Sequence, residues 1–351
     1  MAISESAPSD TREPGLAMPP MVSVVIPCYN EERFIGKVLD KLAGQYDLNS
    51  YEIIVVDGLS NDDTRRVVAE SEKSHPEISI KVIDNAKRTI PHALNLGVAA
   101  ARGEIIARMD AHAVASENYI RGCVDVLLNG GAAVVGMPCR VRPAESTLMA
   151  RAIAAAVSHP FGIGDATYRL GKKSSGQEAV DTVAFACFRK SLWQELGGFN
   201  EDLLTNEDYD FNYRVRQRGG QVILDHSGHC DYFARATLKG LARQYRRYGH
   251  WKARMVRLHP GSIKPRHMVA PLFVLSIPLL GLAGKWSSWA WWLLGLELAL
   301  YAVLSVIFGF QVAPKSKRAA ILALLMPVVF LTIHLTWGTN FLLGMFKRSQ
   351  R

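Results

Sequence analysis

Short apolar runs alternate with amphipathic stretches over the first third of the chain. The runs have the length and the β-branched content of strands: VSVVIPC (22–28), YEIIVVD (51–57), ISIKVID (78–84) and EIIARMD (104–110). The stretches between them have the apolar spacing of helices: 31–45, 62–74 and 91–101. This order predicts an α/β fold of the Rossmann-like kind, a mostly parallel sheet with helices on both faces.

Polar residues follow three of the predicted strands directly, at 27–31, 57–63 and 110–112. In parallel sheets, ligands bind beyond the carboxyl ends of the strands, so these residues are candidates for a binding site. The sequence has no GxGxxG after the first strand and no GxxxxGK(S/T) motif. Dinucleotide-binding and P-loop functions therefore lose their main support.

Residues 236–262 have the pattern of a basic amphipathic helix. Apolar side chains recur every three or four positions, and arginines and lysines fill positions between them. The apolar positions are Leu238, Leu241, Tyr245, Tyr248, Trp251, Met255 and Leu258. Such a helix, with aromatic residues on its apolar side, is typical of a membrane interface. A core helix with a solvated basic face is the alternative that this pattern alone leaves open.

The remaining residues, 263–351, contain hydrophobic segments at 268–284, 286–310 and 319–346 with hardly any charge. Their lengths suit membrane spans, and the cluster of tryptophans at 286–292 is typical of a membrane interface. Basic residues precede the first segment and follow the second, which favours the cytoplasmic side for both. A third full crossing would place the basic terminus FKRSQR outside. The last segment could instead return, or end as an interfacial helix after Gly338.

Composition agrees with a membrane protein whose main domain lies in a reducing compartment. The chain has 351 residues, a net charge of +9, and five cysteines without disulfide-type spacing. A basic balance suggests nucleic acid, anionic lipid or an anionic substrate as partner. The basic residues flank apolar segments and form no recognised nucleic-acid motif, which favours the membrane. Residues 1–20 lack a signal-peptide core and are expected to be a disordered leader; residues 21–235 would form the main domain.

Four acidic motifs carry the candidate chemistry: PCYNEE (27–32), VVDGLSNDDT (55–64), RMDAH (108–112) and TNEDYDF (205–211). Each also has an ordinary structural interpretation. The first two could be capped turns, and the acids of the fourth could be a solvated helix start. Asp110 ends a buried strand and therefore needs a cation, which could be Arg108, another arginine or a metal ion.

Taken together, the order of these motifs resembles the family-2 glycosyltransferases, which have the GT-A fold. The matching elements are IPCYNE, VVDGLSNDDT, MDAH at the DxD position, NEDYDF, and QYRRY (244–248) at the Q/RxxRW position. The combination of ARMDAHA, HPFGIGDATYRLG (159–171) and the short hydrophobic C-terminal region resembles, more narrowly, the bacterial ExoA-type succinoglycan-biosynthesis glucosyltransferases.

The resemblance implies a role for each matching residue. Pro27, Tyr29 and Glu31 would line a uridine pocket, Asp57 would bind uracil or ribose, Asp62 would be the second aspartate, and Arg88 would contact base or phosphate. Asp110 and His112 would hold a divalent cation, Mn²⁺ or Mg²⁺. Asp208 would be the catalytic base, with Glu207 also on the acceptor side. Gln244, Arg247 and Tyr248 would lie beside the donor diphosphate.

The sequence departs from the family pattern at two positions. His112 replaces the second acid of DxD, and imidazole suits Mn²⁺ better than Mg²⁺, which prefers oxygen ligands. Tyr248 replaces a tryptophan that processive synthases usually keep, which favours the addition of a single sugar.

These features predict a membrane-attached, inverting glycosyltransferase. It would move a sugar, with glucose from UDP-glucose expected, onto a polyprenyl-diphosphate-linked saccharide in exopolysaccharide biosynthesis. It would work at the bacterial inner membrane, with the catalytic domain in the cytoplasm and other polysaccharide-assembly proteins as possible partners. One alternative is a polyprenyl-phosphate glycosyltransferase of the dolichol-phosphate mannosyltransferase type. Another is a non-catalytic membrane scaffold of a polysaccharide synthase complex.

Overall fold

The computed structural model describes residues 22–47, 50–170, 176–312 and 319–346; the expected leader, 1–20, lies outside them. The strands are β1 (Val22–Cys28), β2 (Tyr51–Asp57), β3 (Ser79–Asp84), β4 (Ile105–Arg108), β5 (Ala113–Ala115), β6 (Val134–Gly136), β7 (Cys139–Pro143), β8 (Gln177–Ala179), β9 (Cys187–Arg189), β10 (Val222–Asp225) and β11 (Cys230–Ala234). The helices are α1 (Ile35–Leu42), α2 (Thr64–Ser74), α3 (Ile90–Ala100), α4 (Tyr119–Asn129), α5 (Leu148–Ala156), α6 (Pro160–Ile163), α7 (Lys190–Glu195), α8 (Glu207–Gln217), α9 (Leu238–Leu258), α10 (Arg266–Ala283), α11 (Ser288–Val312) and α12 (Ala319–Phe346), with short 3₁₀ turns η2 (Thr167–Arg169) and η3 (Pro260–Ser262).

The main sheet runs β3-β2-β1-β4-β9-β6-β10-β8 within the described residues. Strands β1 to β4 are mutually parallel, and β6 is parallel to β10. Strand β9 lies antiparallel between β4 and β6, and β8 is antiparallel at the edge. The predicted α/β fold with a mostly parallel sheet is confirmed, whereas the two antiparallel strands and the small sheet β5-β11-β7 were not predicted.

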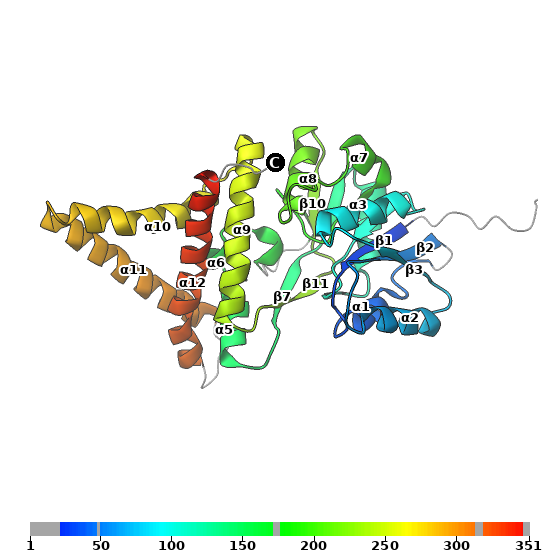
Figure 1. The fold of residues 1–351 in the computed structure, drawn as a ribbon, viewed down its shortest axis with the longest axis horizontal. Helices are drawn as coiled ribbons and strands as arrows, with labels where there is room; N and C mark the ends of the chain where they lie inside the picture. Colours follow the sequence, from blue (N-terminus) through cyan, green and yellow to red (C-terminus); the bar gives the residue numbers. More distant parts are fainter. Residues whose placement is uncertain (1–21, 48–49, 171–175, 313–318, 347–351) are drawn as a thin grey trace, which may run out of the picture.

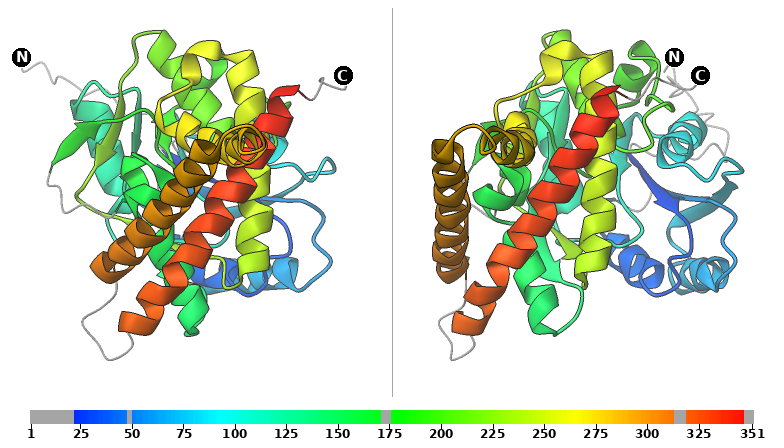
Figure 2. Two further views of the ribbon diagram at one scale, coloured as in Figure 1. Left: turned by 90° about the vertical axis from the view of Figure 1, so that its left-hand side faces the viewer. Right: turned by 60° about the vertical axis from the view of Figure 1, so that its left-hand side comes forward.

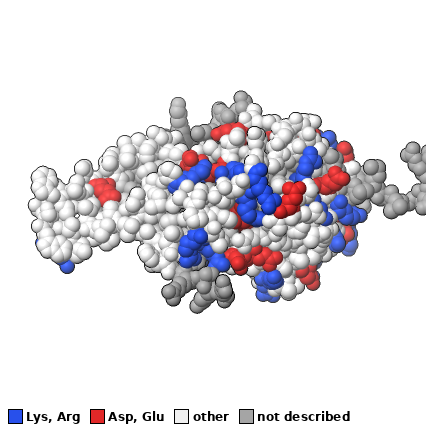
Figure 3. Space-filling model, turned by 90° about the horizontal axis from the view of Figure 1, so that it is seen from above, with Lys and Arg blue, Asp and Glu red and all other residues white. Residues whose placement is uncertain are grey.

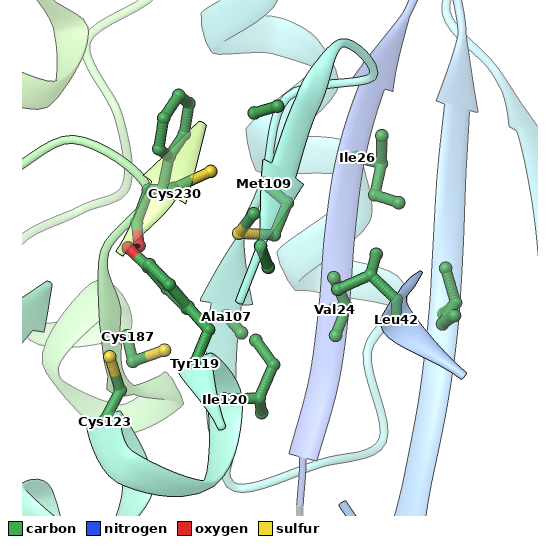
Figure 4. Packing of buried hydrophobic residues seen from close by; sticks show 14 of the residues in the cluster. Val24, Ile26, Leu42, Ala107, Met109, Tyr119, Ile120, Cys123, Cys187 and Cys230 are labelled. Atoms are coloured by element: carbon green, nitrogen blue, oxygen red, sulfur yellow. Dashed lines mark hydrogen bonds between the residues drawn. The ribbon is translucent and has the colours of Figure 1, made fainter. Parts of the chain in front are cut away.

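Helices cover both faces of the sheet, with α1 and α2 below it and α3, α7 and α8 above it in Figure 1. The alternation along β1 explains this, because Val24 and Ile26 pack into one core and Val25 into the other. Figure 4 shows the first core, where Tyr119 of α4 lies among the buried side chains and its hydroxyl donates to the Phe185 carbonyl at 2.8 Å. The two buried apolar cores, one on each face of the sheet, therefore hold the strand ends in fixed positions.

Helices α9 and α12 lie side by side and separate the main domain from the other apolar helices (Figures 1 and 2). A Cβ atom on Gly249 would lie 2.3 Å from the Trp337 carbonyl oxygen, so the two backbones are in direct contact. The apolar side of α9 is thereby buried, including Leu241, Tyr245 and Met255. The sequence predicted this helix and its apolar side, but α12 and the main domain cover that side.

Helices α10 and α11 protrude from this wall as a hairpin (Figures 1 and 2), and the protruding part carries few charged side chains (Figure 3). By length and composition, α10, α11 and α12 are each able to cross a membrane, so the three predicted apolar segments are confirmed as helices. Helix α12 continues without a break through Gly338 to Phe346, and whether it crosses the membrane or lies at its surface stays a prediction.

Candidate active site

The loops that follow the strands contain several strained backbone positions. Non-glycine residues with positive φ occur at Asn30, Leu59, Arg88, Phe185 and Asn206. Asparagine tolerates this conformation, but for leucine or phenylalanine it costs about 1–3 kcal/mol and persists only where the surroundings enforce it. Asn206, with φ 71°, stands immediately before α8 and turns the chain so that the acids of TNEDYDF begin the helix. Strain of this kind is concentrated at functional sites.

Hydrogen bonds join the loop after β1 to the loop after β2. The Glu32 amide donates to Asp62, which also accepts from the Thr64 hydroxyl, and the Asn30 amide donates to the Ser60 hydroxyl. Asp57 is 1% exposed; it accepts from Ser60 and forms an ion pair of 2.6 Å with Arg65. Both aspartates therefore shape the loops, and their roles in donor binding remain predictions.

Three residues predicted to bind the donor lie close to these loops. Pro27 occupies the end of β1, paired with Val56 of β2. Tyr29 is 45% exposed, and the Arg88 guanidinium lies 5.6 Å from the centre of its ring. An exposed aromatic ring with an arginine over it offers a stacking surface and a positive charge, which suits a base and a phosphate.

Arg108, at the end of β4, is the centre of a buried charge cluster. Its Nη2 lies 3.0 Å from Asp110 Oδ1 and 3.3 Å from Glu207 Oε1, and its Nη1 lies 3.7 Å from Asp208 Oδ2. Burial disfavours the charged guanidinium, but these carboxylates outweigh burial and raise the pKa of Arg108. The ion pair with Arg108 that the sequence left open for Asp110 is therefore present.

The two acids at the start of α8 differ in their surroundings. Glu207 is 5% exposed, so the solvated helix start considered from the sequence is wrong for it. Burial, followed by the charge of Asp208, raises the pKa of Glu207 to about 7. The Asp208 side chain is 30% exposed and lines a cavity. Asp208 is thus the more accessible carboxylate of this pair.

His112 is connected to the first loop through Glu31, whose Oε1 lies 3.0 Å from His112 Nδ1. Burial acts to lower the pKa of His112, but the hydrogen bond with Glu31 and the charge of Asp110 raise it. Among the described residues, no three His, Cys, Asp or Glu side chains form a metal site on their own. Asp110 and His112 offer an oxygen and a nitrogen donor on one turn, which fits a cation that takes its other ligands from a bound substrate.

A cavity of about 430 Å³ joins this cluster to the apolar helices. Asp110, His112, Glu207 and Asp208 line one part, and the predicted trio Gln244, Arg247 and Tyr248 of α9 lines another. The Gln244 amide donates to the hydroxyls of Tyr232 and Tyr248, at 2.8 and 3.0 Å. The structure therefore brings the DxH, acidic and QYRRY motifs to one cavity.

Sequence reasoning missed several residues of this cavity. Arg169 lies 5.1 Å from the ring centre of Tyr232, and its buried Nε has no hydrogen-bond partner among the described residues. It belongs to HPFGIGDATYRLG, which the sequence singled out without giving any of its residues a role. Lys252 of α9 and Arg266 of α10 also line the cavity. No local pattern distinguishes these cations from the many exposed ones in α9, because only burial does so.

The sequence profile described as Glycosyl transferase family 2 matches residues 23–197. The chain belongs to this family. This family-2 glycosyltransferase is 26% identical over 326 residues to the Succinoglycan biosynthesis protein ExoA of Rhizobium meliloti, which covers 91% of this chain and 93% of the relative. It is 23% identical over 331 residues, 93% of this chain and 97% of the relative, to a Methanococcus voltae protein. That protein is named dolichyl N-acetyl-alpha-D-glucosaminyl phosphate 3-beta-D-2,3-diacetamido-2,3-dideoxy-beta-D-glucuronosyltransferase.

Among solved structures, the family-2 chain is similar to the mannosyltransferase PcManGT of Pyrobaculum calidifontis in complex with GDP-Man and Mn²⁺. The TM-score is 0.57 with 22% sequence identity, and the match covers 93% of this chain and 86% of the other. This likeness confirms the predicted GT-A fold.

The raised pKa of Glu207 predicts how stability changes with pH. The folded chain keeps the Glu207 proton up to about pH 7, whereas the unfolded chain loses it near pH 4.5. The contribution of Glu207 to the free energy of unfolding is therefore fully present below pH 4.5 and is lost as pH rises through 7. Glu207→Gln removes this loss, which amounts to at most about 3 kcal/mol. Between pH 5 and 8, the Tm of the variant should therefore rise by about 5 °C relative to the unmodified protein, measured by thermal scans in detergent.

Glu195→Gln, which changes an exposed glutamate of α7, is the matched control for loss of a charge. A Tm difference between Glu207→Gln and the unmodified protein that stays constant from pH 5 to 8 would contradict the assignment.

Proposed function

We propose that the chain is an inverting, membrane-attached glycosyltransferase that moves a sugar, with UDP-glucose as the expected donor, onto a polyprenyl-diphosphate-linked saccharide. One observation carries the proposal: a single cavity runs from Asp110 and Asp208 to Val269 and Trp337 on the apolar helices. A donor bound at the strand ends and an acceptor held at a membrane surface would meet in that cavity.

Asp208 is the proposed base. Its carboxylate takes the proton of an acceptor hydroxyl, whose oxygen attacks the anomeric carbon while the bond from that carbon to the diphosphate oxygen breaks and UDP leaves. One such in-line displacement inverts the anomeric centre. Arg108 holds Asp208 and Asp110 to one guanidinium, which fixes the base relative to the donor side. Gln244, Arg247 and Tyr248 would contact the departing diphosphate from α9.

Asp110 and His112 are the proposed protein ligands of a divalent cation, with Glu31 orienting the imidazole through Nδ1. When bound, such a cation would neutralise charge on the departing diphosphate. Tyr29 and Arg88 would hold the base and a phosphate, and Pro27, Glu31, Asp57 and Asp62 would shape the nucleotide pocket.

The names of the two relatives support a lipid-linked acceptor and a role in polysaccharide assembly. The Rhizobium protein is a succinoglycan biosynthesis protein, and the name of the Methanococcus enzyme describes transfer to a dolichyl-linked sugar phosphate. We therefore propose exopolysaccharide biosynthesis at the bacterial inner membrane, with the catalytic domain on the cytoplasmic side.

In this arrangement, the α10–α11 hairpin crosses the membrane and α12 lies along its surface. The 18 residues of α10 rise about 27 Å, close to the roughly 30 Å of a hydrocarbon core. The exposed tryptophans near the tip, Trp286, Trp289 and Trp292, would reach the far interface. The side chains of Ser276 and Glu297 join the two helices by a hydrogen bond of 2.7 Å.

Unlike α10 and α11, helix α12 is not proposed to cross the membrane. It lies along α9, whose Arg243, Arg246 and Arg247 are exposed. These arginines share a groove with Asn340 of α12, so a full crossing by α12 would draw guanidinium groups into hydrocarbon, at about 2.5–3.5 kcal/mol each. Its outer side is apolar, with Leu324 66% and Leu343 62% exposed. A surface position places the basic segments around 264–266, 314–318 and 347–351 on one side, as the positive-inside rule requires.

Replacing the proposed base is the central test. Asp208→Asn should lower transfer by about 10²–10⁴-fold, because the acceptor hydroxyl loses its proton acceptor. UDP binding should stay near normal, measured by calorimetry beside a UDP-release assay. Asp202→Asn, at an 81% exposed side chain, is the control. Full activity of Asp208→Asn would reject the base, and activity retained only with a polyprenyl phosphate acceptor would favour the polyprenyl-phosphate glycosyltransferase.

The metal site gives a second test. Mn²⁺ should support UDP release at least as well as Mg²⁺, since imidazole is a poorer ligand for Mg²⁺. His112→Asp restores two acids and should lower the ratio of Mn²⁺-supported to Mg²⁺-supported activity. Equal activity in excess chelator would exclude a metal role.

The membrane arrangement is tested by cysteine labelling. The native cysteines are buried, so single cysteines report with little background. Ser287→Cys at the hairpin tip should react with an impermeant maleimide only from the side opposite to Ser74→Cys in α2. Ser349→Cys, beyond α12, should react from the same side as Ser74→Cys. Labelling of Ser349→Cys from the side of Ser287→Cys would mean that α12 crosses the membrane.

A further inference from the structure

Lys252 of α9 is a buried cation for which the catalytic scheme has no use. The residue is 5% exposed, and its Nζ lies 3.3 Å from the centre of the Tyr209 ring. No described residue forms an ion pair with it, although it lines the same cavity as Asp208. A buried ammonium without a counter-charge is costly, so its position calls for an explanation.

The surroundings of Lys252 are rich in positive charge. Lys264 Nζ lies 3.0 Å from Asp181 Oδ2, and Arg266 also pairs with Asp181 and with the exposed Asp165. The buried Asp181 is thus already engaged by two other cations. Burial, followed by the charge of Arg266, lowers the pKa of Lys252 to about 7. The charges of Asp181 and Asp208 do not offset these effects, and a bound anion in direct contact with Lys252 would favour its charged form.

Lys252 and Arg266 line the part of the cavity where the charged lining gives way to an apolar one. Lys252 is one helical turn beyond Tyr248 and stands beside the first turn of α10. Val269 and Ala270 of α10, with Ile333 and Trp337 of α12, form the apolar wall of the cavity next to it. An amphiphile with an anionic group and an apolar tail matches this sequence of surfaces.

We propose that Lys252, together with Arg266, which also lines the cavity, binds the phosphate group of the lipid-linked acceptor. The proposal rests on the proposed function and deepens it by naming the acceptor subsite. The acceptor phosphate would sit against these two cations, its tail would follow the wall of α10 and α12, and its sugar would reach Asp208. Lysine binds phosphate as a compact point charge, which suits a headgroup that varies in the sugar it carries.

The donor diphosphate is the other phosphate group that could bind to Lys252, but the positions of the donor residues argue against it. The donor residues Asp110 and His112 lie at the end of β4, connected to Arg108 and Glu31. The cluster of Lys252 is instead organised by Asp181 and by the beginning of α10. The acceptor phosphate would thus lie one helical turn of α9 beyond Tyr248, which is proposed to contact the donor diphosphate.

The test is a binding measurement on the full-length protein in nanodiscs, with farnesyl diphosphate as the probe and farnesol as its uncharged counterpart. Lys252→Met keeps most of the stem and removes the charge. It should weaken farnesyl diphosphate binding about tenfold or more, as expected for a lost charged hydrogen bond, and leave farnesol and UDP binding unchanged. Lys239→Met, an exposed lysine of the same helix, is the matched control and should bind like the unmodified protein.

Equal affinity of Lys252→Met and unmodified protein for farnesyl diphosphate would overturn the proposal, as would a parallel loss of UDP affinity, which would assign Lys252 to the donor. A thermal scan reports folding of the variant, whose Tm should be equal or higher because an unpaired buried charge is gone. If Lys252→Met does not fold, Arg266→Met, which removes the other cation of this part of the cavity, takes its place, and unchanged affinity there overturns the proposal. No turnover is needed, so this result is independent of whether Asp208 catalyses transfer.

Discussion

The ion cluster around Arg108 is the interaction on which the candidate active site depends. One buried guanidinium holds carboxylates from the turn after β4 and from the start of α8, segments almost 100 residues apart in the chain. Three carboxylates exceed one guanidinium, and Glu207 absorbs part of the excess because its raised pKa lets it keep a proton near neutral pH. The remaining negative charge faces the cavity, where a cation or a proton of the substrate would meet it.

Charge is therefore divided across the cavity. Acidic groups gather near the end of β4 and the start of α8, and Lys252, which has no ion pair among the described residues, lies beside Arg266 where α9 meets α10. Two substrates that both carry phosphate need such a division, because one cationic site would not distinguish them. Asp208 stands between the two regions, partly exposed and attached to Arg108 at 3.7 Å. The position of the proposed base thus follows from the separation of the two charged regions.

The fold could be predicted from the sequence wherever local pattern and burial agree. The apolar strands β1, β2 and β4 and the helices between them are of this kind, since every position of β2 is buried. Strand β9 could not be predicted because its three residues pair with β4 and β6 only after distant segments meet. The motifs predicted Asp110, Asp208 and Gln244 as site residues, and the three line one cavity, whereas Lys252 and Arg169 resemble any other basic residue until their burial is known.

Helix α9 shows how a correct pattern led to an incomplete interpretation. Its apolar stripe predicts a surface for lipid, but α12 and the main domain cover that stripe, and the α9 and α12 backbones are in direct contact at Gly249. In the proposed membrane arrangement, the apolar outer side of α12 faces the lipid, while the arginines of α9 remain beside it. A helix with this neighbour is stable at an interface and unstable across a bilayer. Hydrophobic length alone cannot make that distinction, since it depends on the charge of the helix packed alongside.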